Sequence, residues 1–344
     1  MTEALSAADL SAIADVLSRA GVALTGSLAA DLIAGGRSNL TFRLIGRTAE
    51  GERSWVLRTP PRRGRTPSAH DVAREFRVTS ALGATAVPVP PATVLCEDEG
   101  LIGGPFAISG YVDGRAIQAR AELEALGSEA VSAIAGTLVE TLATLHAVDH
   151  VAVGLERFGR PDSYAERQLR RWSGQWELVG TADLDPLARE VARALAARVP
   201  RQQAVGIVHG DFRIDNTLLD LADATRPRVA AVVDWELSTI GDPVADLAMM
   251  CAYRHPVFDL VIGAPTAWTS TLLPDVADLA GRYERAGGAA LVDWERHLAL
   301  AYYKIAVIAA GIDHRRREGS GSGPGFDTAG RSVATYLDLA RAAL

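Results

Sequence analysis

Cysteine is scarce in this chain, which contains only Cys96 and Cys251 among 344 residues. The two cysteines lie far apart in the sequence. Small secreted domains use many cysteines as disulfides, and zinc sites need clustered cysteine or histidine ligands. The sequence therefore argues against a disulfide framework and against a zinc site, and we expect a reducing, cytoplasmic environment.

An excess of basic residues is also absent. Lys and Arg together number 35 against 42 Asp and Glu, which gives a formal net charge of −7. Proteins that bind nucleic acid in general carry a positive surface, because contacts to phosphates dominate their affinity. We therefore expect no nucleic-acid partner.

Long uninterrupted apolar runs are lacking as well. The longest, at residues 298–312, contains Lys304 and is too short to span a bilayer, so it predicts a buried helix. The first three residues, Met1, Thr2 and Glu3, do not begin a basic and apolar signal peptide. We expect no membrane partner, and the sequence leaves the oligomeric state open.

The residues that are present indicate a folded chain with two lobes. Hydrophobic residues make up 48% and charged residues 22%, a composition typical of globular proteins. A chain of 344 residues exceeds what one simple core usually supports. Strand patterns dominate up to about residue 110 and helical patterns follow, so we expect an N-terminal lobe at 1–110 and a C-terminal lobe at 111–344.

Hydrophobic periodicity predicts a mixed sheet with one key helix in the N-terminal lobe. Helical spacing appears at 6–19, with Ser6 as a candidate N-cap, and again at 71–82. Extended patterns predict five strands, at 32–34, 40–44, 55–58, 93–96 and 105–111.

The clearest chemical signal is a loop that begins with His209, Gly210 and Asp211 and continues to Asn216, followed downstream by Asp234. Phosphoryl transfer needs a carboxylate near the acceptor hydroxyl and oxygen ligands for Mg²⁺. Asp211 can act as the catalytic base. Asn216 and Asp234 can hold Mg²⁺, because hard cations prefer carboxylate and amide oxygens.

The order of these residues resembles the catalytic loop of protein kinases, with Gly210 where those enzymes have arginine. The motif Asp234-Trp235-Glu236 and the segment 241–248 resemble the aminoglycoside phosphotransferase and choline kinase-like family. This resemblance implies an α+β, protein-kinase-like two-lobe fold, with a mainly β N-lobe and a mainly α C-lobe. It also implies a small-molecule kinase that uses ATP and Mg²⁺ to phosphorylate an alcohol group.

The N-terminal lobe would then bind the nucleotide. Gly35, Gly36 and Ser38 lie between two predicted strands, where backbone amides can approach phosphates, although a plain hairpin has the same pattern. Arg58 stands where kinases keep a phosphate-binding lysine, and Glu75 is its expected ion-pair partner. Arginine binds phosphate with a different geometry from lysine, so this position also permits a bystander role.

Further motifs resemble one branch of the family, the kinase-like region fused to some acyl-CoA dehydrogenases. They lie at 58–60, 68–76 and 164–172, and Arg58 is usual in that branch. The resemblance extends from about residue 33 to about residue 311 and implies a hydroxyacyl-CoA-like acceptor.

Other interpretations remain open at this stage. Arginine and tryptophan side chains at 167–176 predict either an anion-binding wall or an ordinary surface helix, and the basic run at 62–65 permits the same two interpretations. The acceptor could instead be an aminoglycoside. A catalytically silent nucleotide-binding regulator is a third possibility, which the joint presence of Asp211, Asn216 and Asp234 disfavours.

Overall fold

The computed structural model describes residues 4–35, 39–61 and 71–344. They divide into two units, one formed by residues 1–113 with 230–238 and the other by residues 114–229 with 239–344. No helix among the described residues is both long enough and apolar enough to cross a membrane. The two units are described separately below.

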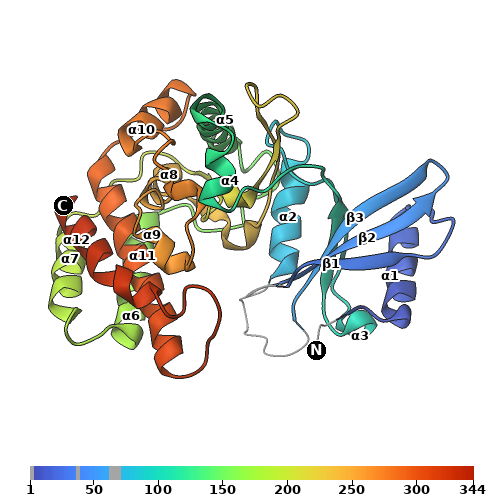
Figure 1. Ribbon diagram of the computed structural model, residues 1–344, viewed down its shortest axis with the longest axis horizontal. Helices are drawn as coiled ribbons and strands as arrows, with labels where there is room; N and C mark the ends of the chain where they lie inside the picture. The colour runs from blue at the N-terminus through green and yellow to red at the C-terminus, as the bar shows by residue number, and fades with distance from the viewer. Residues whose placement is uncertain (1–3, 36–38, 62–70) are drawn as a thin grey trace. The chain divides into compact units, whose positions relative to one another are not determined.

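A five-stranded sheet lies at the centre of the first unit (Figure 1). Every neighbouring pair in it is antiparallel, so the expectation of a mixed sheet was wrong. In spatial order the strands are β1 (Ala29–Gly35), β2 (Leu40–Thr48), β3 (Gly51–Thr59), β5 (Phe106–Gly110) and β4 (Ala92–Cys96). Only a few residues separate β1 from β2 and β2 from β3, and strands so close in sequence pair antiparallel.

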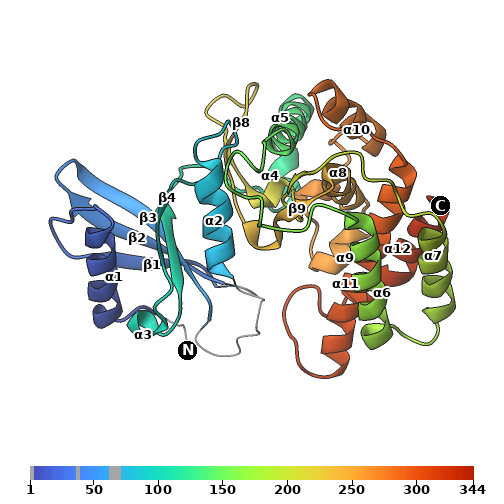
Figure 2. The same cartoon turned by 180° about the vertical axis from the view of Figure 1, so that it is seen from behind.

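Helices cover both faces of this sheet, as Figures 1 and 2 show. Helix α1 (Ala7–Arg19) covers one face, and Ile13 and Leu17 pack there against apolar side chains of β2, β3 and β5. The Ser6 hydroxyl accepts a hydrogen bond from the Asp9 amide at 3.1 Å, which confirms the predicted N-cap. Helix α2 (Val72–Leu82) lies on the other side, and α3 (Glu99–Ile102) is a single turn that the sequence did not predict.

Residues 230–238 belong to the first unit although they lie far along the chain. They contain the end of β8 (Arg228–Val232) and the short helix η2 (Trp235–Leu237). The Val232 amide donates to the Pro88 carbonyl at 2.8 Å, and the Arg74 guanidinium donates to the Ser238 carbonyl at 2.9 Å. The expected boundary at residue 110 divides the chain into two continuous segments. In the structure, residues 230–238 instead return to the first unit.

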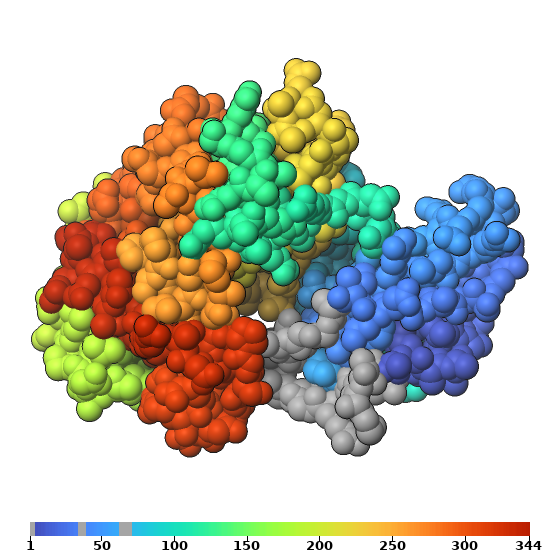
Figure 3. Space-filling view, viewed as in Figure 1, coloured from blue at the N-terminus to red at the C-terminus, as the bar shows by residue number. Residues whose placement is uncertain are grey.

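The second unit is mainly helical, as its sequence predicts. Its helices are α4 (Arg120–Glu124), α5 (Ser128–His146), α6 (Tyr164–Val179), α7 (Asp185–Ala197), α8 (Pro243–Ala252), α9 (Phe258–Ile262), α10 (Val276–Arg285), α11 (Trp294–Arg317) and α12 (Val333–Ala342), with short turns η1 (Ile214–Asn216), η3 (Ala267–Thr269) and η4 (Ala329–Ser332). Helix α11 contains the long apolar run and packs against α6, α8 and α12. Helix α4 lies beside η3 on the surface that Figure 3 shows.

Three short strands of the second unit carry the candidate catalytic loop. Strands β6 (Gly206–Val208) and β9 (Thr239–Gly241) pair antiparallel, and β7 (Thr217–Asp220) follows η1. The loop at 209–213 therefore begins at the end of a buried strand, and helix α8 begins two residues after β9.

Candidate active site

The backbone of the loop at 209–213 is held by a carboxylate from α8. Asp246 is 1% exposed and accepts hydrogen bonds from the His209 amide at 2.7 Å and from the Gly210 amide at 2.9 Å. Gly210 has φ +87°, a left-handed conformation that glycine adopts without a steric penalty. Although burial raises the pKa of Asp246, hydrogen bonding with His146 and Gly210 more than offsets this effect, and its pKa lies below its usual value. Asp246 is thus a charged anchor for the loop.

Asp211 leaves this loop with its carboxylate partly accessible, since 21% of its side chain is exposed. The Asn216 amide nitrogen donates to the Asp211 carbonyl at 2.8 Å and to its Oδ2 at 3.0 Å. Arg213 lies on the other side, with its Nε 3.4 Å from Asp211 Oδ1 and its Nη1 2.5 Å from Asp215. The structure therefore brings the predicted residues Asp211 and Asn216 together and adds Arg213, which the sequence interpretation missed.

Lys304 is a second residue that the sequence interpretation missed. It projects from α11, and its ammonium lies 5.7 Å from the centre of the Trp172 ring. Burial lowers its pKa, and the charges of Asp211 and Asp246 act in the opposite direction. Composition held a signal: Lys304 is the single lysine among the 35 basic residues of the chain.

Helix α6 does not form one arginine and tryptophan cluster, because its residues face different neighbours. Trp172 points toward α11, and its indole nitrogen donates to Gln168 at 3.0 Å. Trp176 is buried and donates to Asp185 at 3.1 Å, and Arg167 donates to the Arg160 carbonyl at 2.6 Å. Arg171 stays beside Trp172, with its guanidinium 5.3 Å from the centre of the ring, and the choice between an anion-binding wall and an ordinary surface helix concerns this pair.

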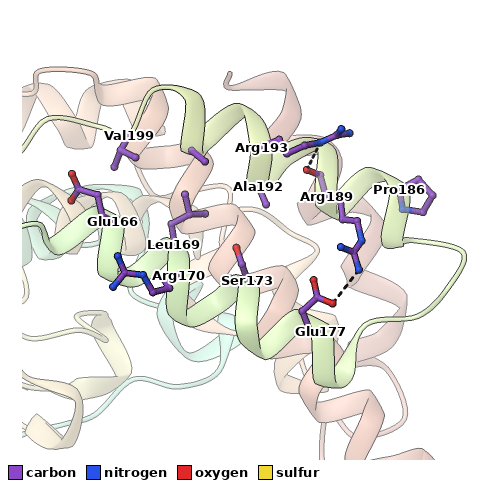
Figure 4. A pocket seen from close by; sticks show the side chains of 11 residues that line it. Glu166, Leu169, Arg170, Ser173, Glu177, Pro186, Arg189, Ala192, Arg193 and Val199 are labelled. Carbon is purple, nitrogen blue, oxygen red and sulfur yellow. Dashed lines mark hydrogen bonds and ion pairs between the residues drawn. The ribbon is translucent and has the colours of Figure 1, made fainter.

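The opposite face of α6 lines a larger groove of about 790 Å³ shared with α7, which Figure 4 shows. Apolar side chains such as Leu169 line it together with Arg170 and Arg193. Arg189 bridges Glu177 at 3.0 Å within it. None of its lining residues belongs to the loop at 209–213, so its size alone does not indicate the catalytic site.

The first unit contains an ion-paired arginine at the position expected for nucleotide binding. Arg58 in β3 contacts Glu75 of α2 at 2.7 Å and Asp234 at 3.2 Å. The expected pair with Glu75 is therefore present, and Asp234 is an additional partner. Although burial lowers the pKa of Arg58, Glu75 and Asp234 more than offset this effect and raise its pKa above its ordinary value.

The backbone at Asp234 is unusual, with φ +66°, in the left-handed region that non-glycine residues seldom occupy. Such a conformation costs free energy and persists where surrounding contacts over-determine it. Here the contacts include the bond from Arg58 and the hydrogen bond from the Trp235 indole to the Val232 carbonyl at 2.9 Å. These contacts hold the Asp234 carboxylate in one orientation.

The predicted glycine-rich turn is only partly described. Gly35 ends β1 and pairs with Leu40 of β2, whereas Gly36 and Ser38 lie outside the described residues, as does the basic run at 62–65. Asn39 is 5% exposed, and neither of its side-chain polar atoms has a hydrogen-bond partner among the described residues. The sequence interpretation did not single out Asn39.

Each unit separately presents an oxygen of the kind that binds Mg²⁺, from Asn216 in the second unit and from Asp234 in the first. Neither Asn216 Oδ1 nor Asp234 Oδ2 accepts a hydrogen bond from a described residue. Amide and carboxylate oxygens are the ligands that Mg²⁺ takes, and it takes few of them from protein when a substrate supplies phosphate oxygens. Among the described residues there is no group of three or more His, Cys, Asp or Glu that could hold a metal ion.

Comparison with known proteins agrees with this chemistry. Residues 30–300 match the model of the phosphotransferase enzyme family. Acyl-CoA dehydrogenase family member 10 of Mus musculus is 35% identical over 309 residues, which cover 89% of this chain and 28% of that protein. Acyl-CoA dehydrogenase family member 11 of Homo sapiens is 34% identical over 291 residues, which cover 83% of this chain and 36% of that protein. The chain thus spans about a third of the length of these relatives.

Solved structures show the same fold over nearly the whole chain. A crystal structure from Ralstonia eutropha, assigned provisionally as an aminoglycoside phosphotransferase, is 30% identical, with a TM-score of 0.82 and 97% of both chains covered. A complex of the phosphotransferase APH(4)-Ia with AMP-PNP and hygromycin B is 18% identical, with a TM-score of 0.60. The match covers 96% of this chain and 97% of that one, and at this identity it supports the fold alone.

These findings define the class of protein as a phosphotransferase with a kinase-like fold that acts on small molecules. The chain belongs to the phosphotransferase enzyme family, and the fold predicted from its sequence is confirmed.

Proposed function

We propose that the chain is an ATP- and Mg²⁺-dependent kinase that phosphorylates the hydroxyl group of a small molecule. The observation that carries this proposal is the Asp211 carboxylate, which is accessible and held by Asn216 and Arg213. A protein that only binds nucleotide has no need for such a group. The proposal therefore disfavours the silent regulator.

Each residue has a separate role in the proposed reaction. Asp211 accepts or orients the proton of the acceptor hydroxyl, as a positioned carboxylate can. Asn216 and Asp234 supply oxygen ligands for Mg²⁺, which neutralises charge on the phosphate oxygens when bound. His209 stabilises the loop, since its Nδ1 accepts a hydrogen bond from the Asp211 amide at 3.3 Å.

Nucleotide binding is assigned to the first unit. The complexes of related folds with AMP-PNP and with GDP support a nucleotide donor. Arg58 and Glu75 form the phosphate-binding pair, and the turn that contains Gly35, Gly36 and Ser38 covers the phosphates through its backbone amides.

For the acceptor we propose a hydroxyacyl-CoA-like compound. The support is the identity of 32–35% to proteins named as members of the acyl-CoA dehydrogenase family or as a probable acyl-CoA dehydrogenase. An aminoglycoside is the second candidate, because the Ralstonia eutropha structure at 30% identity carries that provisional assignment. Aminoglycosides are polycations, and they require acidic groups beside the catalytic carboxylate. The carboxylate nearest to Asp211 along the loop, Asp215, is paired with Arg213, and Arg213 also contacts Asp211, so the support for a polycation at this loop is weaker.

Phosphate transfer from labelled ATP should be measured across hydroxyacyl-CoA thioesters, free hydroxy acids and aminoglycosides, with and without Mg²⁺. We expect Mg²⁺-dependent transfer to at least one hydroxyacyl compound. Transfer to aminoglycosides with none to hydroxyacyl compounds would reverse the choice of acceptor. ATP binding without transfer to any acceptor would favour the regulator.

A substitution at Arg58 tests the nucleotide site. Arg58→Ala removes the partner of two carboxylates and leaves Glu75 buried without a countercharge, so we expect ATP affinity to fall roughly tenfold or more. Arg53 lies on the same strand β3 and is exposed, so Arg53→Ala is the matched control and should bind ATP normally. Equal ATP affinity in wild type and Arg58→Ala, measured by calorimetry with Mg²⁺, would make Arg58 a bystander.

A further inference from the structure

The choice of basic residue at position 304 differs from that everywhere else in the chain. Arginine fills every other basic position, 34 in all, and lysine occurs once. At an exposed position, lysine and arginine both keep the protein soluble, so the arginines on the surface need no local explanation. A lysine offers a compact ammonium in place of a planar fork of donors, which matters where space is restricted. The exception therefore indicates a geometric requirement at this site.

The surroundings of Lys304 restrict space. Its side chain lines a cavity of about 20 Å³ together with Trp172, Gln168 and His297. That volume holds about one water-sized group, so it can admit a single oxygen atom but not a phosphate or a sugar ring. The other lining residues come from α6, α8 and α11, which all belong to the second unit.

Lys304 is the polar group of this cavity that has room for a ligand. Within the described part of the chain it is half-buried and makes neither a hydrogen bond nor an ion pair, and its ammonium lies over the Trp172 ring. The buried ring of His297 instead faces Asp242, whose Oδ2 lies 3.8 Å from its Nε2. A half-buried ammonium keeps only part of its hydration, so a ligand that brings an oxygen acceptor would supply Lys304 with a hydrogen-bond partner.

The cavity is also close to the proposed reaction. Ala245 lines the cavity, and its neighbour on α8, Asp246, accepts the backbone hydrogen bonds of His209 and Gly210 in the catalytic loop. The Trp172 ring beside the ammonium also carries the Arg171 guanidinium, 5.3 Å from its centre, and the rest of its apolar edge can pack against a short aliphatic chain. A ligand whose oxygen enters this cavity would therefore carry an aliphatic segment along Trp172.

We propose that Lys304 binds the acyl oxygen of the acceptor, a carboxyl-derived oxygen separated from the reacting hydroxyl by a few carbon atoms. This inference rests on the proposed kinase function and names the feature of the acceptor that is recognised. Either a thioester carbonyl or the carboxylate of a free hydroxy acid provides such an oxygen. Lys304 positions the acceptor, while Asp211 acts on the hydroxyl.

Matched acceptors that differ in this one oxygen test the proposal. The first comparison is between hydroxyacyl-CoA thioesters, with the hydroxyl on the third, fourth or fifth carbon, and the corresponding CoA thioethers, which lack the carbonyl. The second comparison is between free hydroxy acids and the diols that lack the carboxylate. We expect wild type to prefer the compound with the acyl oxygen. In Lys304→Met its kcat/KM should fall roughly ten- to hundredfold, because a hydrogen bond to a charged group is lost. Activity on the thioether and the KM for ATP should not change.

The control is Arg193→Met, which removes a positive charge from an exposed position on α7. It should retain the preference of wild type, and urea unfolding of both variants shows whether they fold. Loss of activity on thioester and thioether alike in a folded Lys304→Met protein would overturn the proposal, as would an unchanged preference. Absence of transfer to every acceptor would contradict the kinase function itself, a separate failure.

A second measurement is independent of turnover. An amine-specific acetylating reagent can modify only Lys304 and the N-terminal amine, since the chain has no other lysine. The hydroxyacyl-CoA should slow acetylation of Lys304 relative to the N-terminal amine, followed by mass spectrometry, and the thioether should slow it less. Equal protection by both compounds would reject Lys304 as the group that binds the acyl oxygen.

Discussion

Asp211→Asn is expected to lower turnover by roughly 10²–10⁴-fold while ATP affinity stays unchanged, because a general base acts mainly in the transition state. The amide cannot accept the hydroxyl proton, but it can still accept the hydrogen bond that Asn216 donates at 3.0 Å. The loop should therefore keep its conformation. Single-turnover phosphate transfer and calorimetric titration with ATP measure the two quantities separately.

Two further variants separate the roles of the carboxylates. Asp215→Asn changes a neighbouring carboxylate that pairs with Arg213, and it should reduce turnover far less than Asp211→Asn. Asp234→Asn should weaken Mg²⁺-dependent nucleotide binding, because it replaces a charged metal ligand with a neutral one. If Asp211→Asn and Asp234→Asn lowered ATP affinity equally, the proposed division of roles would be wrong.

Local patterns in the sequence were sufficient to predict most elements of the first unit. Alternating apolar residues mark one face of β2 and β3, and the structure buries Phe42, Leu44, Trp55 and Leu57 on it. These elements are set by side-chain periodicity and by capping at Ser6, which act over a few residues. The antiparallel direction of every strand was not predicted, because it depends on how β4 and β5 pair after the intervening helix α2.

The candidate site was predictable where it depends on order along the chain. Asp211 and Asn216 are five residues apart, and one turn brings their side chains into contact. The pair between Arg58 and Glu75 followed from the resemblance to kinases, since nothing in the spacing alone requires it.

The rest of the site depends on packing between distant helices. The role of Asp246 requires α8 to lie beside the loop at 209–213, which no local pattern specifies. The separation of Arg170 from Trp172 depends on the rotation of α6 about its axis, because residues two apart on a helix point in different directions. Lys304 was visible in the composition, but its meaning requires knowing which side chains surround it.

Asp242, the N-cap of α8, and Asp246, in its first turn, should respond to the same substitution with opposite signs. Asp246 accepts two backbone amide hydrogen bonds and lies 3.3 Å from His146, so its charged form is stabilised. Asp242 is buried and accepts the Val244 amide at 3.0 Å, but one of its oxygens has no hydrogen-bond partner among the described residues. Burial raises its pKa to about 6 and lowers that of His297, 3.8 Å away, to about 4, so the histidine brings no countercharge at neutral pH.

Asp246→Asn should destabilise the protein at pH 7 by about 1.5–3 kcal/mol, the usual contribution of a hydrogen bond to a charged group, and should also lower turnover because the loop loses its anchor. Its folded pKa lies below the unfolded value, so this contribution is present above about pH 4 and is lost as the pH falls through the folded pKa.

Asp242→Asn should instead stabilise the protein at pH 7 by up to about 3 kcal/mol, since the raised folded pKa means that ionisation costs free energy as the pH rises from about 4 to above 6. Urea unfolding of wild type and both variants between pH 4 and 8 measures these differences. The Asp242→Asn advantage should disappear near pH 4, and two variants that lose stability in parallel at every pH would show that the two carboxylates do not differ as their surroundings predict.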